Sequence, residues 1–213
     1  NRGRQVMVEQ IAGWVLIFLF TVTFHEVAHG AVAFVRGDRL AKALGRLTLN
    51  PLKHIDWFWT VVFPLFLFFT TSGRFMVGMA KPVPVNPYNF RDQKYGSLKV
   101  ALAGPASNFS IALVFGLILR FFPGLFAIEG LVLMFSYIVY INILLAIFNL
   151  MPVPPLDGSR ILFSLLPYSA RKIKIFFQQF SIFILLFIIF FFFPYLTLII
   201  NWIFNLITGF PSL

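Results

Sequence analysis

Long apolar segments dominate this chain and decide what it can fold into. They cover about residues 8–35, 98–119, 131–150 and 175–210. A helix needs about 20 apolar residues to cross a hydrocarbon core that is about 30 Å thick. Charged residues make up 11% of the 213 residues, whereas soluble domains carry about 25%, so this chain has too few to cover a surface in water. We therefore expect an all-α, multi-pass integral membrane protein.

Two apolar segments have lengths that do not match one membrane-spanning helix each. The region 175–210 is too long for one crossing, and Pro194 near its middle favours two spans that meet at a tight turn. The shorter segment 57–71 is interrupted by Pro64, which favours a re-entrant segment. The sequence thus predicts about five spans, five to six, around a core of three helices. A small re-entrant or β-hairpin region is expected at about 44–87, between the first two core helices.

The basic residues lie between the apolar segments and predict the orientation in the membrane. The net charge is +10, from 17 Lys and Arg against 7 Asp and Glu. If the segment 57–71 does not cross, Arg2, Arg4 and Arg120 share one side and the other fourteen basic residues share the opposite side. Because basic residues concentrate on the cytoplasmic side, we expect the N-terminus outside and the C-terminus in the cytoplasm. The sequence has no compact basic module with interleaved aromatic residues, which argues against nucleic acid as a partner.

The motif His25-Glu26-Val27-Ala28-His29 interrupts the first apolar segment toward its cytoplasmic end. Two histidines four residues apart lie on one face of a helix, so both imidazoles can bind one metal ion. The glutamate beside the first histidine can take a proton from a water on that metal. The chain has no cysteine, so any metal site uses His, Asp or Glu. Such groups are costly inside a membrane unless they have a function.

A third ligand is expected, because catalytic zinc sites use three protein ligands and leave one position open for water. The remaining candidates are His54, Glu9, Asp38, Asp56, Asp92, Glu129 and Asp157. Asp157 is favoured because it follows three prolines within 152–155 and precedes Gly158, a pattern that predicts irregular backbone beside a polar site. The alternative is that Asp157 is a turn residue or a helix N-cap. We expect His54 to have a structural or headgroup-level role.

Other polar residues in the apolar segments are candidates for a supporting role. Asn149 could bind the substrate backbone or a developing oxyanion, or it could make an ordinary hydrogen bond between helices. Gly104 and Ala106 permit close contact between helices. Ser107 and Asn108 are expected to hydrogen-bond within the helix core rather than to act in catalysis. The helix that carries these four residues is expected to lie between the other two core helices.

Three blocks of the sequence, taken together, resemble the site-2 protease family of intramembrane zinc metalloproteases. These blocks are His25 to His29, Gly104-Pro105-Ala106-Ser107-Asn108, and Asn149 through Gly158, in that order. The stretches 45–51 and 81–87 also resemble the compact bacterial and archaeal branch of the family, which lacks a PDZ domain. The resemblance implies that His25, His29 and Asp157 bind one Zn²⁺ per chain.

The resemblance also implies a function, in which Glu26 activates water. The chain would be an intramembrane zinc metalloendopeptidase that hydrolyses peptide bonds in or near the transmembrane segments of membrane-protein substrates, in regulated intramembrane proteolysis or in clearance of signal remnants. We expect a single metalloprotease domain over residues 1–213, in a prokaryotic cell membrane, with the active site toward the cytoplasmic side. Its partners would be transmembrane substrates and the lipid bilayer, and the oligomeric state stays open. The alternatives are a metal transporter or sensor, and an inactive scaffold that binds membrane helices.

Overall fold

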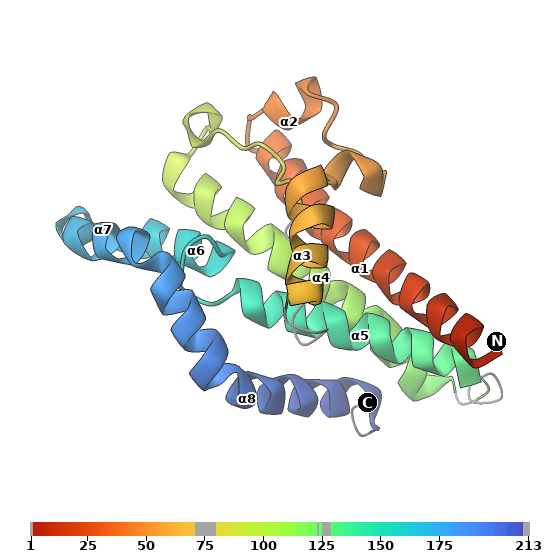
Figure 1. Cartoon of the computed structure of the whole chain (residues 1–213). Coiled ribbons are helices and arrows are strands. Elements are labelled where there is room, and N and C mark those ends of the chain that lie inside the picture. The colour runs from red at the N-terminus through yellow and green to blue at the C-terminus, as the bar shows by residue number, and fades with distance from the viewer. Residues whose placement is uncertain (1, 71–79, 123, 125–128, 211–213) are drawn as a thin grey trace.

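The computed structural model describes residues 2–70, 80–122, 124 and 129–210, and every regular element in these ranges is a helix (Figure 1). The long helices are α1 (Arg2–Val35), α4 (Gln93–Phe121), α5 (Glu129–Asn149) and α8 (Ser181–Thr208). The shorter α-helices are α2 (Leu40–Ala43), α3 (Phe63–Thr70), α6 (Asp157–Leu165) and α7 (Arg171–Gln179). A π-helix, η2 (Trp57–Val62), precedes α3, and the 3₁₀ turns are η1 (Pro51–His54), η3 (Pro87–Asn89) and η5 (Tyr168–Ala170). The predicted all-α class is confirmed.

Within the described residues, four helices are long and apolar enough to cross a membrane. They are Ala12–Val35 of α1, Tyr95–Phe121 of α4, Gly130–Asn149 of α5 and Ser181–Thr208 of α8. The first three agree with the three core helices predicted from the sequence. The helical segment formed by η2 and α3 is too short to belong to this set, as expected for the apolar segment interrupted by Pro64.

The predicted fifth span is wrong, because α8 runs through Pro194 as one bent helix (Figure 1). A proline withdraws one backbone donor and bends a helix without necessarily ending it. In lipid, a full break would leave further N–H and C=O groups without partners, so bending is the less costly solution. Four crossings would return the chain to the side where it began, so the predicted placement of the two termini on opposite sides does not follow.

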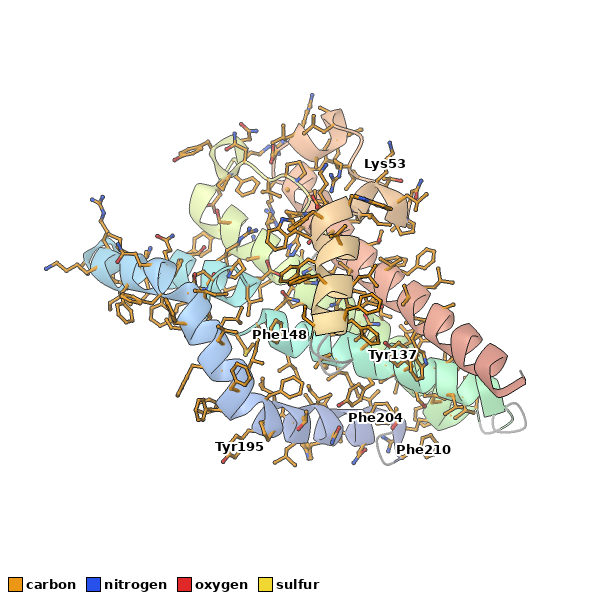
Figure 2. The ribbon with its side chains drawn as sticks, in the orientation of Figure 1. Lys53, Tyr137, Phe148, Tyr195, Phe204 and Phe210 are labelled. Carbon is orange, nitrogen blue, oxygen red and sulfur yellow. The ribbon has the colours of Figure 1, made fainter. Side chains whose placement is uncertain are left out.

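Helix α4 lies at the centre of the bundle and contacts α1, α5, α6 and α8, as expected for the middle core helix. A buried apolar cluster forms where α4, α5 and α8 meet, from Ala112, Leu119, Val139, Ile143, Ile200, Phe204 and Ile207. Figure 2 shows Phe204 turned toward α5, where its ring centroid lies 6.2 Å from that of Tyr140. Tyr195 lies on the outer side of α8 and is 63% exposed. The cluster therefore anchors the second half of α8 to the core.

The region between α1 and α4 contains no strand in its described part, so the predicted hairpin is not found there; residues 71–79 lie outside the described ranges. Short helices and an extended stretch, 80–86, take its place. Three prolines in the Lys81–Pro87 stretch remove the N–H donors that a ladder needs. Side chains such as Asn50 accept backbone N–H groups and start short helices instead.

Two buried polar side chains, Asp38 and His54, stabilise this region. The carboxylate of Asp38, just beyond the end of α1, accepts hydrogen bonds from the backbone N–H groups of Leu40 (3.1 Å) and Asn86 (2.7 Å) and from the side chain of Asn89 (2.8 Å). His54 is buried, with Nε2 2.9 Å from the carbonyl oxygen of Thr48. His54 was expected in a surface loop, but its contacts agree with the expected structural role. Asp38 thus holds the extended stretch close to the end of α1, and His54 closes the turn from Thr48 and accepts the N–H of Lys81 with its backbone carbonyl.

Candidate metal centre

His25 and His29 lie one turn apart on the same face of α1, inside the protein. Both side chains are buried. Their Nε2 atoms are 3.1 Å apart, and the two ring planes are nearly perpendicular, at 85°. The i, i+4 spacing therefore brings the two nitrogens to one point, as the sequence predicted.

Asp157 reaches the same point from the first residue of α6. Its Oδ2 atom lies 3.1 Å from Nε2 of His25 and 3.0 Å from Nε2 of His29. Burial alone would raise the pKa of this carboxyl group, but hydrogen bonds and charge interactions with the two histidines outweigh that effect, and the pKa is lowered. Asp157 does not act as a helix cap, since the N-cap position of α6 is Leu156.

The turn before α6 depends on close backbone contact at Gly158. A Cβ atom at this position would run into the carbonyl oxygens of Leu150 and Met151. The residue lies in the first turn of α6 and is not among the glycines with positive φ. Its small size, rather than the sharp turn expected from the sequence, is what places Asp157 against α1.

Helix α4 supports the two histidines with its backbone. Nδ1 of His29 lies 2.6 Å from the carbonyl oxygen of Val100, so Nδ1 carries the proton and the Nε2 lone pair faces the centre. One turn further along α4, a Cβ atom at Gly104 would lie 2.5 Å from Nε2 of His25 and against Nε2 of His29. Nδ1 of His25 is buried without a partner among the described residues. The contact with Val100 had no signal in the sequence, because a backbone carbonyl is common to all residues.

The three converging atoms fit a zinc ion. Ligands at 2.0–2.1 Å in a tetrahedral arrangement lie about 3.3–3.4 Å from one another, close to the observed 3.0–3.1 Å. Two imidazole nitrogens and one carboxylate oxygen are typical zinc donors. Because the lone pairs of these three buried atoms repel one another, a cation between them would stabilise the arrangement. In the described part of the chain, His25, His29 and Asp157 are the one group of three such residues close enough to hold a metal.

The other predicted site residues lie around this centre without joining it. Glu26 follows His25 on α1, and its Oε2 atom accepts a hydrogen bond of 2.7 Å from the backbone N–H of Val83 in the extended stretch. The side-chain nitrogen of Asn149 donates to the carbonyl oxygen of Leu145 in its own helix, at 2.9 Å. The structure therefore brings together three of the five predicted residues, keeps Glu26 adjacent, and gives Asn149 an intrahelical bond.

Polar residues of α4 and α5 also lie in the core of the helix bundle. Ser107 Oγ donates to the carbonyl oxygen of Gly104 at 2.7 Å. Asn108 is fully buried, and its side-chain atoms have no partner in the described ranges. Asn142, a polar residue of an apolar segment that was not among the predicted site residues, donates to Thr21 Oγ1 at 3.1 Å and joins α5 to α1.

Comparison with known proteins agrees with this centre. The chain is 39% identical over 163 residues to YwhC of Bacillus subtilis, which is named as a candidate zinc metalloprotease, and the match covers 74% of this chain and 70% of YwhC. The chain belongs to peptidase family M50. This is the site-2 protease family, so the predicted resemblance is confirmed. The family profile itself matches residues 124–192, which include Asp157.

Two more distant relatives are longer than this chain. Rip2 of Mycolicibacterium smegmatis, also named as a candidate zinc metalloprotease, is 30% identical over 156 residues, which cover 72% of this chain and 55% of Rip2. A zinc metalloprotease of Methanocaldococcus jannaschii is 28% identical over 156 residues, 72% of this chain and 35% of that protein. No solved structure matches the chain. Together with the four apolar helices, family membership makes the chain an integral membrane, zinc-dependent protease.

Proposed function

We propose that this protease cleaves peptide bonds in or near the transmembrane segments of membrane-protein substrates, and that residues 1–213 act as one catalytic domain. The observation that carries the proposal is the convergence of His25, His29 and Asp157 within 3.1 Å at one end of a membrane-spanning helix. A centre at this depth is useful when the bond to be cleaved is itself in the membrane.

His25, His29 and Asp157 are the proposed ligands of the zinc ion. Bound there, zinc supplies Lewis-acid chemistry, because it acidifies water and polarises a peptide carbonyl. Glu26 is the proposed general base, since it lies next to His25 on the same helix. Its carboxylate takes the proton of the attacking water and passes that proton to the leaving amine. The hydrogen bond from Val83 holds one carboxylate oxygen of Glu26 and leaves the other for this transfer.

Asn149 is proposed as a contact for the substrate backbone. In the free protein its side-chain nitrogen bonds the carbonyl of Leu145, so this role requires the amide to turn toward the bound peptide. A helical substrate hides its carbonyl groups in internal hydrogen bonds, and it must unwind locally before attack.

The active site is proposed to face the cytoplasm. Thirteen basic residues of the described ranges lie in the segments that follow α1, begin α4 or follow α5. His25 and His29, in the second half of α1, and Asp157, at the start of α6, lie toward the same end of the bundle. Arg2, Arg4 and Arg120 lie at the other end. The positive-inside rule favours the crowded end as the cytoplasmic one.

The variant Glu26→Gln tests the proposal. Proteoliposomes with purified protein are given a fluorescent single-pass peptide, and the products are identified by mass spectrometry. Because only the base is lost, we expect full zinc content and cleavage slowed by ~10²–10⁴-fold. Glu9→Gln, the same change on the same helix, is the matched control and should cleave at the wild-type rate. Asp157→Ala should instead lose the zinc.

Two outcomes would contradict the assignment. Cleavage by Glu26→Gln at the wild-type rate would remove Glu26 as the base. Undiminished zinc in Asp157→Ala would remove the third ligand. Wild-type protein that binds the peptide at full zinc occupancy without cutting it would instead favour a helix-binding scaffold.

A further inference from the structure

A groove of about 470 Å³ opens beside the metal centre, between the extended stretch, the first turns of α4 and the start of α6. Its walls are mostly apolar and include Val83, Val85, Val100 and Ala101. Arg160 of α6 also lines the groove and is the one charged residue among its described lining residues. Figure 1 shows α6 beside α4, and these two helices are in contact.

Each wall of the groove is one contact away from the metal centre. Val83 donates its backbone N–H to Glu26, and the carbonyl of Val100 holds His29. Arg160 lies three residues after Asp157 on the same helix, so both side chains project from the same face of α6. A peptide that lay in the groove would therefore have its next residues at the zinc ligands and the general base.

The charge of Arg160 is not neutralised within the described part of the protein. The ion pairs of Asp157 are with the two histidines, and neither of them involves Arg160. The side chain of Arg160 is exposed. A guanidinium that lines an apolar groove is suited to bind a carboxylate, with which it forms short, charge-assisted hydrogen bonds.

We propose that this groove binds the stretch of substrate next to the scissile bond, and that Arg160 selects substrates with an aspartate or glutamate in that stretch. The proposal rests on the proposed function, since it needs a peptide substrate at the metal centre. The remaining residues of the stretch would be apolar, because the walls offer few polar groups.

An acidic residue in the stretch that lies in the groove would distinguish substrates from most other membrane helices. Cytoplasmic flanks of transmembrane segments are rich in lysine and arginine, and such flanks are repelled by the basic end of this protein, with its net charge of +10. A flank with a carboxylate avoids this repulsion and gains the contact with Arg160. Selection would thus combine attraction of one class of helix with rejection of the larger class.

The first test uses the wild-type protein and a set of peptides. In proteoliposomes, a single residue is varied as Glu, Gln or Lys at each position within reach of the cleavage site found by mass spectrometry. We expect one short stretch, on one side of the cleaved bond, where Glu is preferred over Lys by about ten- to hundredfold in kcat/KM. No dependence on the charge at any position would overturn the proposal.

The second test reverses the charge on the protein. Arg160→Glu should prefer Lys over Glu at the same peptide position, and Arg160→Gln should lose the preference between Glu and Lys. Zinc content should stay unchanged in both variants. Lys172→Glu, an equal change of charge on the exposed surface of α7, is the control and should keep the wild-type preference.

The outcomes separate this proposal from the proposed function. If the wild type cleaves no peptide, the proposed function fails. If the wild type cleaves but Arg160→Glu keeps the preference for Glu, the groove proposal fails alone. If the rates follow the fraction of anionic lipid in the vesicles and not the charge on the peptide, Arg160 binds lipid phosphate, and the proposal is overturned.

Discussion

The variant Gly104→Ala should empty the metal centre without touching any ligand. Gly104 lies where α4 passes closest to the two histidines. A Cβ atom there would lie 2.5 Å from Nε2 and from Cε1 of His25, and would also press against Nε2 of His29. The added methyl group would thus enter the space in which the donor atoms converge.

The size of the effect follows from these contacts. Ordinary van der Waals contact begins at 3.4 Å, so the new methyl group is about 0.9 Å too close. Neither ring can retreat easily, since Oδ2 of Asp157 is within 3.1 Å of both and the carbonyl of Val100 holds His29. Zinc ligands tolerate displacements of about 0.2 Å. We therefore expect the zinc affinity to fall at least ~100-fold, and cleavage to fall with it.

The measurement is zinc affinity, by competition with a chelator, together with zinc content of the purified protein. Overpacking costs about 1–3 kcal/mol of stability, so thermal unfolding is followed in parallel. Gly13→Ala is the matched control: it lies in α1, where a Cβ atom would meet nothing within 4 Å, and it should keep wild-type zinc. A Gly104→Ala protein with wild-type zinc affinity would refute the close approach of α4 to the ligands.

Two further predictions concern the residues that hold the extended stretch. In Gly30→Ala the new Cβ atom would lie 2.9 Å from Cγ1 of Val83, so Val83 should move away from Glu26. Cleavage should then slow by up to about tenfold at unchanged zinc content. An unchanged rate would show that the contact with Val83 does not orient Glu26. Asp38→Asn should lower the free energy of unfolding at pH 7 by about 2–4 kcal/mol, because the amide NH₂ cannot accept one of the three hydrogen bonds and the other bonds lose their charge. Burial opposes ionisation of Asp38, but hydrogen bonding outweighs it and lowers the pKa of Asp38 below its ordinary 3.8. The stability advantage of the wild type over Asp38→Asn should therefore persist above about pH 4 and shrink as the pH falls further. Thermal unfolding of both proteins from pH 7 to pH 3 measures this advantage, and its loss already near pH 6 would contradict the prediction.

The structure could be predicted from the sequence where side chains follow a regular pattern. Apolar length gave α1, α4 and α5, and the spacing of His25 and His29 gave their common face. The prolines before Asp157 marked an irregular turn, and the structure brings Asp157 from the end of that turn to the two histidines. In each case the local pattern of side chains determines the local structure, so tertiary packing had little influence on the outcome.

The sequence failed where the outcome depended on packing or on backbone atoms. Pro194 could end a helix or bend it, and the choice rests on the contacts that anchor the second half of α8 to α4 and α5. The carbonyl of Val100 and the N–H of Val83 are present in any residue, so nothing in the sequence pointed to their roles beside His29 and Glu26. Such contacts are the supporting partners that orient metal ligands.

The proline-rich stretch 81–87 shows how irregular backbone is accommodated beside an intramembrane site. Its prolines have no N–H group to satisfy, and three of the four remaining N–H groups are bonded within the protein, to the carbonyl of His54, to Glu26 and to Asp38. Because few donors are left free, the stretch can lie at membrane depth without the cost of unsatisfied polar groups. The same bonds keep it from refolding as a helix or a ladder. The prolines thus remove the donors that would be left free in the wall of the groove, and a donor that remains, the N–H of Val83, holds Glu26.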